Sequence, residues 1–339
     1  MNNTFPKFSS ILAPYLSCFL SENMENKGYS KHLADILKNF DNYLIASGHE
    51  KFYFTQDDYE RWVQHEECND IHTFGDKQHV LVKFFEYMCR FGQECFIPRP
   101  IRVRRSRNEF VPYIYSHDEI QMLFEASDNM RLKRRNHRSI LFTMPILLRT
   151  LYSTGMRLGE ALRLKNKDVR LNEGIFDLNI TKNGHQRVCA MNNSLKKCII
   201  QYLEYRNRIP IKGIDADDSP FFVTTIGTSP GKSDVYAIFR RILANSGIPF
   251  TGSWKGPNIH SLRHTACVHA LIRMVQNGMD MYCNLPILSA YLGHIHCYDT
   301  ERYIHLAHEV FPDIITKDLA YTNGLDDIII KTLKSNEEK

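Results

Sequence analysis

The sequence predicts a mainly α-helical protein of two domains, with a small antiparallel β-sheet in the second domain. Apolar residues recur at helical spacing in the first hundred positions and in most of the chain after residue 194. Between these regions, apolar and polar residues alternate around an Asn183–Gly184 pair, which is typical of a β-hairpin. The length of 339 residues also favours two domains, because a single hydrophobic core rarely grows beyond about 250 residues.

Residues 1–98 are expected to form a four-helix bundle. Ser30 and Thr55 suit N-caps, and Gly48 suits the end of a helix. The expected helices cover residues 9–20, 30–48, 55–62 and 74–91.

A basic stretch, residues 99–111, is expected to link the two domains. Pro98 and Pro100 disfavour a helix there, and a run of like charges resists burial. The run could lie along DNA phosphates or be a solvated tether, and both interpretations stay open. Its arginines are Arg99, Arg102, Arg104, Arg105 and Arg107.

The net positive charge of the chain comes from the part after residue 98. Residues 1–98 carry nine basic against 14 acidic side chains, whereas the rest carries 34 against 24. A polyanion such as DNA is a natural partner for this basic part, because cations that neutralise phosphates release counterions. A charge that merely keeps the surface soluble is the alternative.

Residues 112–312 are expected to form the second domain. Ser116 and Glu119 form a capping box at the start of its first helix. In the hairpin, the apolar face is expected to hold Phe176, Leu178 and Ile180 before the turn, and Val188 and Ala190 after it.

Two further helices are expected near the end of this domain. One opens at Leu285–Pro286 and ends at a left-handed Gly293. The next is short and is capped by Asp299 or Thr300. Residues 280–284 are then an extra loop.

Targeting and metal signals are weak in this sequence. No stretch has the length of a membrane span, and the N-terminus lacks a secretory pattern, so a cytosolic protein without a membrane partner is expected. The nine cysteines are odd in number and lack a Cys-x-x-Cys spacing, which indicates small buried hydrophobic residues. We therefore expect no metal.

Several short motifs carry residues suited to phosphate chemistry. Arg157 stands at the start of a helix with Glu160 placed to orient it, and His260 and Arg263 are three residues apart. Arginine forks bind phosphate oxygens in pairs, and a histidine can move a proton near neutral pH. His264 falls on another face and is interpreted as a core or capping residue.

Two further candidate residues lie near the end of the second domain. His294 comes just after a helix end, and Tyr303 follows it by nine residues. A tyrosine is a weak nucleophile until positive neighbours favour its phenolate form. Each of these residues taken alone is more simply a surface pair, a packing aromatic or a solvated side chain.

In combination, these motifs resemble the tyrosine recombinases, the phage-integrase family. The resemblance implies a helical, SAM-like core-binding domain followed by an α+β catalytic domain. On this resemblance, Lys182, on the hairpin 25 residues after Arg157, is the general acid for the leaving oxygen. The implied catalytic set is Arg157, Lys182, His260, Arg263, His294 and Tyr303.

The resemblance also implies a reaction and partners. Tyr303 would cut a DNA strand to give a 3′-phosphotyrosyl intermediate, and strands would exchange through a four-way junction without any cofactor. The implied partners are double-stranded DNA with specific recombination sites and further copies of the chain in a tetramer. The tail, residues 313–339, could dock on a neighbouring protomer or fold back on its own domain.

Other functions remain open from the sequence. A type IB topoisomerase uses similar residues to nick and reseal one DNA, and a non-catalytic DNA-binding regulator could share the fold. A metal-dependent nuclease is disfavoured because the sequence shows no carboxylate cluster. The target sequence, the mobile element or chromosome served, and the use of accessory DNA-bending proteins are not readable from the sequence.

Overall fold

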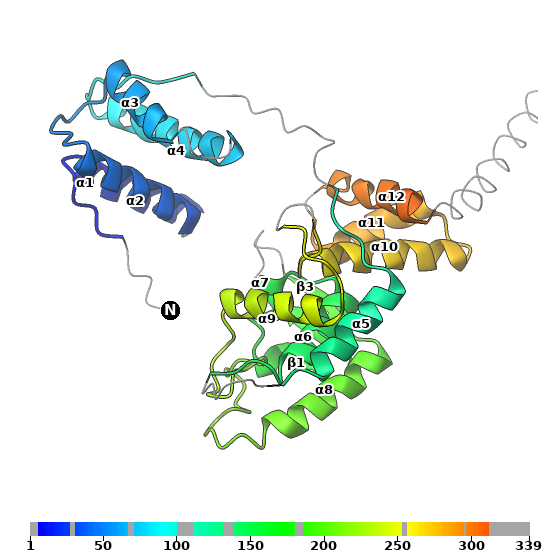
Figure 1. The fold of residues 1–339 in the computed structure, drawn as a ribbon. Coiled ribbons are helices and arrows are strands. Elements are labelled where there is room, and N and C mark those ends of the chain that lie inside the picture. Colours follow the sequence, from blue (N-terminus) through cyan, green and yellow to red (C-terminus); the bar gives the residue numbers. More distant parts are fainter. Residues whose placement is uncertain are drawn as a thin grey trace, which may run out of the picture. The chain divides into compact units, whose positions relative to one another are not determined.

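The fold is that of a computed structural model, in which the chain divides into two compact units, Met1–Arg107 and Asn108–Lys339 (Figure 1). The division falls within the stretch expected to link two domains. The structure does not describe the side chains of residues 72, 308 and 309. The structure describes residues 6–27, 31–66, 71–99, 111–131, 138–179, 186–252, 256–294 and 296–311.

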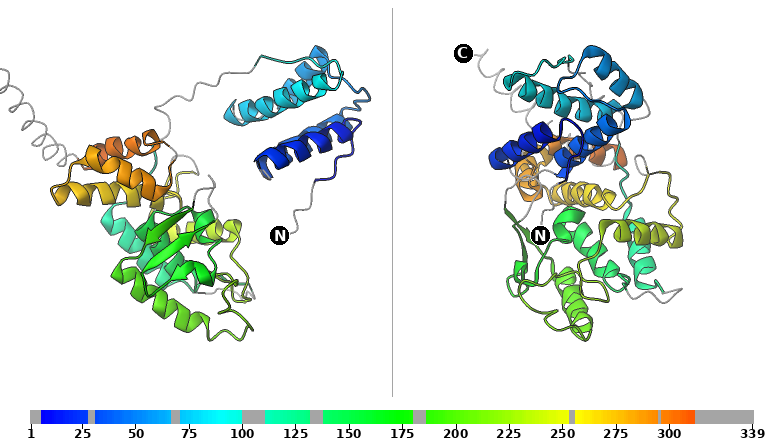
Figure 2. Two further views of the ribbon diagram at one scale, coloured as in Figure 1. Left: turned by 180° about the vertical axis from the view of Figure 1, so that it is seen from behind. Right: turned by 90° about the vertical axis from the view of Figure 1, so that its left-hand side faces the viewer.

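The first unit contains the four expected helices. Helices α1, α2 and α4 pack against one another (Figure 1, Figure 2), and the Thr55 hydroxyl caps α3 by accepting a hydrogen bond from the backbone N–H of Asp58. The first helix begins four residues later than expected. The helices are α1 (Ala13–Lys27), α2 (Lys31–Ala46), α3 (Gln56–Glu66) and α4 (Ile71–Arg90).

The core of this unit is aromatic. The rings of Phe40, Phe54, Trp62, Phe84 and Phe85 are buried and lie within contact distance of one another, largely edge to face. Such pairs stabilise a core beyond the area that they bury.

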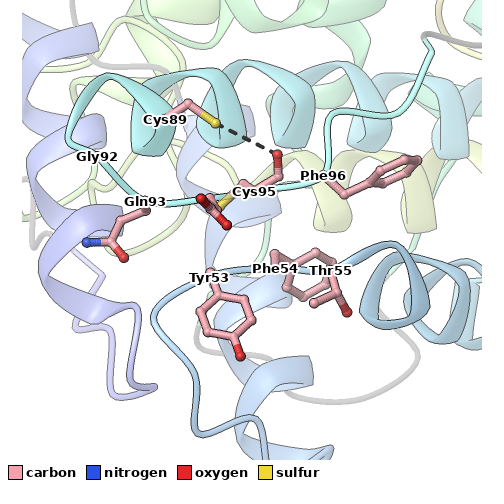
Figure 3. A pocket seen from close by; sticks show the side chains of 9 residues that line it. Tyr53, Phe54, Thr55, Cys89, Gly92, Gln93, Cys95 and Phe96 are labelled. Carbon is pink, nitrogen blue, oxygen red and sulfur yellow. Dashed lines mark hydrogen bonds between the residues drawn. The ribbon is translucent and has the colours of Figure 1, made fainter.

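A hollow of about 550 Å³ lies beside this core, where residues 53–55 pass the loop after α4 (Figure 3). Cys89 Sγ and the carbonyl of Cys95 approach to 3.8 Å at its edge. Glu94 is the charged residue among those that line it. The hollow therefore offers no cation to a nucleic-acid phosphate.

Helices dominate the second unit. Ser116 and Glu119 form the expected capping box, with each side chain accepting from the backbone N–H of the other. The helices are α5 (His117–Asp128), α6 (Met144–Thr154), α7 (Leu158–Ala161), the 3₁₀ turn η1 (Asn166–Asp168), α8 (Asn193–Arg206), α9 (Lys232–Asn245), α10 (Ser261–Gln276), α11 (Met281–Leu292) and α12 (Tyr298–Val310). Helices α10, α11 and α12 pack around a core of their own (Figure 1).

Three short antiparallel strands form the sheet, in the order β1 (Val169–Arg170), β2 (Ile175–Leu178) and β3 (Arg187–Ala190) (Figure 2). Phe176 and Leu178 are buried as expected. The prediction for β3 is wrong. Val188 was expected on the buried face, but it is 47% exposed, and its neighbours along the strand point inward. The register explains this: Leu178 pairs with Arg187, and paired residues share one face of a sheet. Asn183, Gly184 and Ile180 lie outside the described residues.

Two expected helix starts are also wrong. Helix α11 begins at Met281, where Asp280 is the N-cap and accepts a hydrogen bond from the backbone N–H of Cys283. The stretch expected to be an extra loop is thus the first turn of α11, and Pro286 lies inside the helix. Helix α12 begins at Tyr298, and neither Asp299 nor Thr300 caps it.

Within the described ranges, the helices are too short or too polar to cross a membrane.

Candidate active site

Arg263 lies at the centre of the candidate site. It comes from the first turn of α10 and is buried. Its Nη1 donates to the carbonyl of Gly155 at 2.6 Å, and its Nη2 donates to the carbonyl of Leu292 at 2.9 Å. These carbonyls lie at the C-terminal ends of α6 and α11, where the helix dipole favours a cation. Burial lowers the pKa of Arg263, yet a guanidinium stays charged at any accessible pH.

Arg157 is the N-cap of α7, as the sequence predicts. Glu160 accepts from both its backbone N–H, at 2.8 Å, and its Nη1, at 3.0 Å. The side chain keeps 24% of its surface exposed. Its remaining N–H groups can therefore reach a ligand, and the expected orienting role of Glu160 agrees with this geometry.

A second arginine binds the same carboxylate. Arg187 Nη1 and Nη2 donate to the two oxygens of Glu160 at 3.0 and 2.6 Å. Burial disfavours the Glu160 carboxylate, but the hydrogen bonds from Arg187 and from the Arg157 backbone outweigh it and lower the pKa of Glu160 to about 2. Sequence analysis missed Arg187. The hairpin pairing could have found it, because an Asn183–Gly184 turn places residues 187 and 189 on the face of Phe176 and Leu178.

His294 follows Gly293, the left-handed C-cap of α11 with a φ of 65°. Its Nε2 lies 3.0 Å from Nη2 of Arg263, and its Nδ1 lies 2.7 Å from the buried hydroxyl of Thr300. A guanidinium can only donate, so Nε2 accepts and Nδ1 carries the proton. Burial, followed by the charges of Arg263 and Arg157, lowers the pKa of His294 to about 4. The ring is therefore neutral near pH 7.

His260 precedes α10 and is the N-cap residue of that helix. Desolvation of the ring, followed by the charges of Arg263 and Arg157, lowers its pKa to about 4. His260 as a residue is exposed, and its ring lies 4.8 Å from that of His264, the residue that contacts Tyr303. The neutral ring can donate one hydrogen bond to a phosphate oxygen.

Tyr303 comes from α12 and is 2% exposed. Its hydroxyl lies 3.0 Å from Nδ1 of His264, and its ring stacks 6.3 Å from that of His294. Burial, followed by the neighbouring Cys267 thiol, raises the pKa of Tyr303 above its ordinary value, against the opposing charge of Arg263. The expected shift toward phenolate is therefore not found in this state. His264 is buried, as expected for a core histidine, and it also contacts the tyrosine.

The structure thus brings together five of the six residues that the sequence singles out. Lys182 and the arginines at 102, 104, 105 and 107 lie outside the described residues. Arg99 is exposed, and its carbonyl accepts a hydrogen bond from Gln78. The gathered residues are Arg157, His260, Arg263, His294 and Tyr303.

This arrangement is suited to an anion. The site holds two guanidinium groups and two neutral histidines. In the described part of the chain, the only carboxylate that accepts a hydrogen bond from them is Glu160, which two arginines already bind. Preorganised donors of this kind stabilise the charge that develops on a phosphate during its transfer.

Comparison with known proteins agrees with this geometry. Residues 114–309 match the sequence model of the phage integrase family. The chain is similar to a putative integrase/recombinase of Sinorhizobium fredii, with 30% identity over 205 residues, which cover 60% of this chain and 63% of the relative. The match therefore spans less than two thirds of that relative's length. A tyrosine recombinase XerC of Pelobacter propionicus is 23% identical over 246 residues, which cover 72% of each chain.

Solved structures share the fold. The XerH site-specific recombinase bound to palindromic difH substrate has a TM-score of 0.59 and 18% identity, covering 84% of this chain and 78% of the other. The Tn1549 transposon integrase in complex with transposon right-end DNA also has a TM-score of 0.59, with 14% identity and coverage of 85% and 94%. The family match spans more than half of the chain and contains the five gathered residues. The chain belongs to the phage integrase family.

Proposed function

We propose that the protein is a site-specific DNA recombinase that cuts and rejoins DNA strands through Tyr303. The observation that carries the proposal is that Arg263 contacts the carbonyl of Gly155, two residues before Arg157, and also His294, whose ring stacks on that of Tyr303. The family match and the solved relatives bound to DNA support it.

In the proposed reaction, the phenol of Tyr303 gives up its proton to solvent, and its oxygen attacks a phosphorus atom of the DNA backbone. Arg157 and Arg263 stabilise the charge on the non-bridging oxygens, and His260 donates a hydrogen bond to one of them. The bond from phosphorus to the 5′ oxygen breaks, and Lys182 gives that oxygen its proton. The products are a 3′-phosphotyrosyl strand and a strand with a free 5′ hydroxyl.

The second half of the reaction reverses the first on a different strand. A 5′ hydroxyl of the partner DNA attacks the phosphotyrosyl bond, the new phosphodiester forms, and the phenol of Tyr303 leaves. The number of phosphoester bonds is unchanged, so neither nucleotide hydrolysis nor a metal is needed for the exchange. Excess chelator is therefore expected to leave cleavage intact.

Tyr303 has to leave its buried position for this attack. The hydroxyl is bound to His264, and the phenol is protonated near neutral pH. DNA binding, which adds a phosphate beside Arg263, is the step that we expect to displace it. The structure thus corresponds to a state before cleavage.

The proposed partners follow from the charge of the chain and from the family. Residues 99–339 carry a net charge of +10, counting 34 basic and 24 acidic side chains, which suits double-stranded DNA. Exchange between two sites requires four active sites, so we propose a homotetramer on DNA. Residues 1–98 would clamp the DNA core site, residues 99–111 would bridge the two domains, and residues 313–339 would dock on a neighbouring protomer.

The test is covalent capture on a nicked suicide substrate. Wild-type protein should form an adduct that resists denaturant, and Tyr303→Phe should form none while binding DNA with unchanged affinity. Tyr298→Phe is the matched control, because Tyr298 lies on the same helix but is exposed, and it should react like wild type. An adduct with Tyr303→Phe would identify another nucleophile.

The proposed role of Lys182 has its own test. Lys182→Ala should slow cleavage of ordinary DNA much more than cleavage of DNA with sulfur at the leaving 5′ position, because a thiolate leaves without a proton. An equal loss on both substrates would remove Lys182 from this role.

A further inference from the structure

We infer that Arg187 is a positioning residue for strand cleavage, which couples Arg157 to the turn that carries His294. This inference rests on the proposed function. It concerns a residue of β3 that would not touch the DNA but acts through its neighbours on two sides.

The first contact of Arg187 is with Glu160. Both terminal nitrogens bind, one to each carboxylate oxygen, at 3.0 and 2.6 Å. The two side chains are 9% and 1% exposed. A paired, planar contact of this kind fixes both the position and the plane of the carboxylate. It joins β3 to α7, which lie far apart in the sequence and adjacent in the fold (Figure 1).

The carboxylate of Glu160 in turn fixes Arg157. One oxygen accepts from the backbone N–H of Arg157 and the other accepts from its guanidinium. Arg187 therefore determines where the main chain and the side chain of Arg157 can lie. Arg187 also supplies a second positive charge beside Glu160. The Glu160 carboxylate therefore stays ionised when the guanidinium of Arg157 turns toward a phosphate.

The second contact of Arg187 is with Gly293. A Cβ atom placed on Gly293 would lie 3.0 Å from Nη1 of Arg187 and 3.1 Å from its Cδ. The side chain of Arg187 thus packs directly on the backbone of the turn that ends α11. His294 is the next residue, and it holds Nη2 of Arg263. One side chain therefore contacts the supports of both catalytic arginines.

Lysine would not reproduce these contacts. Its single ammonium can bind one oxygen of Glu160 closely and has no flat face to pack on Gly293. Glutamine would keep much of the volume but lose the charge. These two variants separate the paired geometry from the mere presence of a polar side chain.

The experiment measures single-turnover cleavage with saturating suicide substrate, together with DNA affinity and the melting temperature. Arg187→Gln and Arg187→Lys should each slow cleavage by about 10- to 100-fold, as expected when a catalytic group is misplaced by a fraction of an ångström, and DNA affinity should stay unchanged. Arg170→Gln is the matched control, because Arg170 also leaves the sheet in a paired contact with a carboxylate, that of Asp177, but is exposed. It should cleave like wild type.

A double-variant test separates positioning from general loss of structure. In an Arg157→Lys background, adding Arg187→Gln should cause a smaller further loss than it causes in the wild-type protein, because one of the two groups that Arg187 positions is already gone. An equal loss in both backgrounds, or wild-type cleavage by both Arg187 variants, would overturn the inference. Failure of the proposed function gives a different result, since wild-type protein would then form no Tyr303 adduct.

Discussion

The hydroxyl of Tyr303 lies 3.0 Å from Nδ1 of His264. His264 lies in α10, about one helical turn after the N-cap residue His260. The proposed nucleophile is thus held by a buried histidine outside the predicted catalytic set. His264 is neutral at pH 7, because burial and then the nearby His260 lower its pKa to about 3. The contact is therefore a hydrogen bond between neutral groups.

This contact should make Tyr303 resistant to chemical modification. Nitration of the free protein, followed by peptide mapping, should modify the exposed Tyr298 at least several times faster than Tyr303. His264→Phe keeps an aromatic ring but removes the hydrogen bond, and it should raise the rate at Tyr303. Equal rates at the two tyrosines of the wild-type protein would show that Tyr303 is open before DNA binds.

Buried histidines should make the second domain sensitive to acid. His264 and His269 are each 7% exposed, and the pKa of His269 is lowered to about 4 by burial and then by His117. The folded protein keeps both rings neutral at pH 5, whereas the unfolded chain takes up protons below about pH 6.5. The free energy of unfolding should therefore fall between pH 6.5 and 4, by up to about 1.4 kcal/mol per pH unit for each histidine.

Denaturant titrations at several pH values measure this slope. His260 and His294 have lowered pKa values as well, so His269→Gln removes one of four such histidines and should reduce the slope by about a quarter. A slope that is unchanged in this variant would assign the acid sensitivity to other residues.

Arg263→Lys should damage both stability and cleavage. A lysine cannot bond to the carbonyls of Gly155 and Leu292 together, so the free energy of unfolding should fall by about 2 kcal/mol. Cleavage should fall at least about a hundredfold. Arg157→Lys should lose cleavage to a similar degree with a smaller change in stability, because Arg157 is more exposed. Denaturant unfolding and covalent capture measure the two effects.

Gly293→Ala and Gly247→Ala form a matched pair. Both glycines have a positive φ, of 65° and 72°, but only a Cβ at Gly293 would meet Arg187, while Gly247 faces open space. Each alanine should lower the free energy of unfolding by at least about 1 kcal/mol from backbone strain. Only Gly293→Ala should also slow cleavage. If both variants cleave like wild type, the contact between Gly293 and Arg187 has no influence on the site.

The basic linker should control the salt dependence of binding. Replacing Arg102, Arg104, Arg105 and Arg107 by glutamine should weaken binding to specific and random DNA alike, because phosphate contacts carry no sequence information. The slope of log affinity against log salt should become shallower by up to about 0.9 for each lost contact. A slope that does not change would identify the stretch as a solvated tether.

Local signals in the sequence predicted most of the helices and the order of the domains. Capping by Ser116 and Thr55 and the helix ends at Gly48 and Gly293 depend on a few neighbouring residues, so they can be read from the sequence. Pro286 was misleading, because a proline is tolerated inside α11 once Asp280 has capped the helix six residues earlier.

The contacts between side chains in the site could be predicted only where both partners lie in the same short motif. Arg157 and Glu160 are three residues apart and were paired correctly. Arg187 binds Glu160 from 27 residues away, and His264 binds Tyr303 from 39 residues away. Such contacts depend on strand register and helix packing. An arginine on the buried face of a strand also contradicts the usual apolar pattern, so periodicity alone assigns it outward.

The hydrogen bonds from Arg263 to two carbonyls affect which inactivating mutations leave a folded protein. A copy in which Tyr303 becomes phenylalanine keeps the buried ring, so it should keep its folded shape and persist as a DNA-binding protein. A copy that loses Arg263 also loses the tie between the ends of α6 and α11, and its product is exposed to proteolysis. Inactive relatives that survive as DNA-binding proteins should therefore retain the arginine more often than the tyrosine.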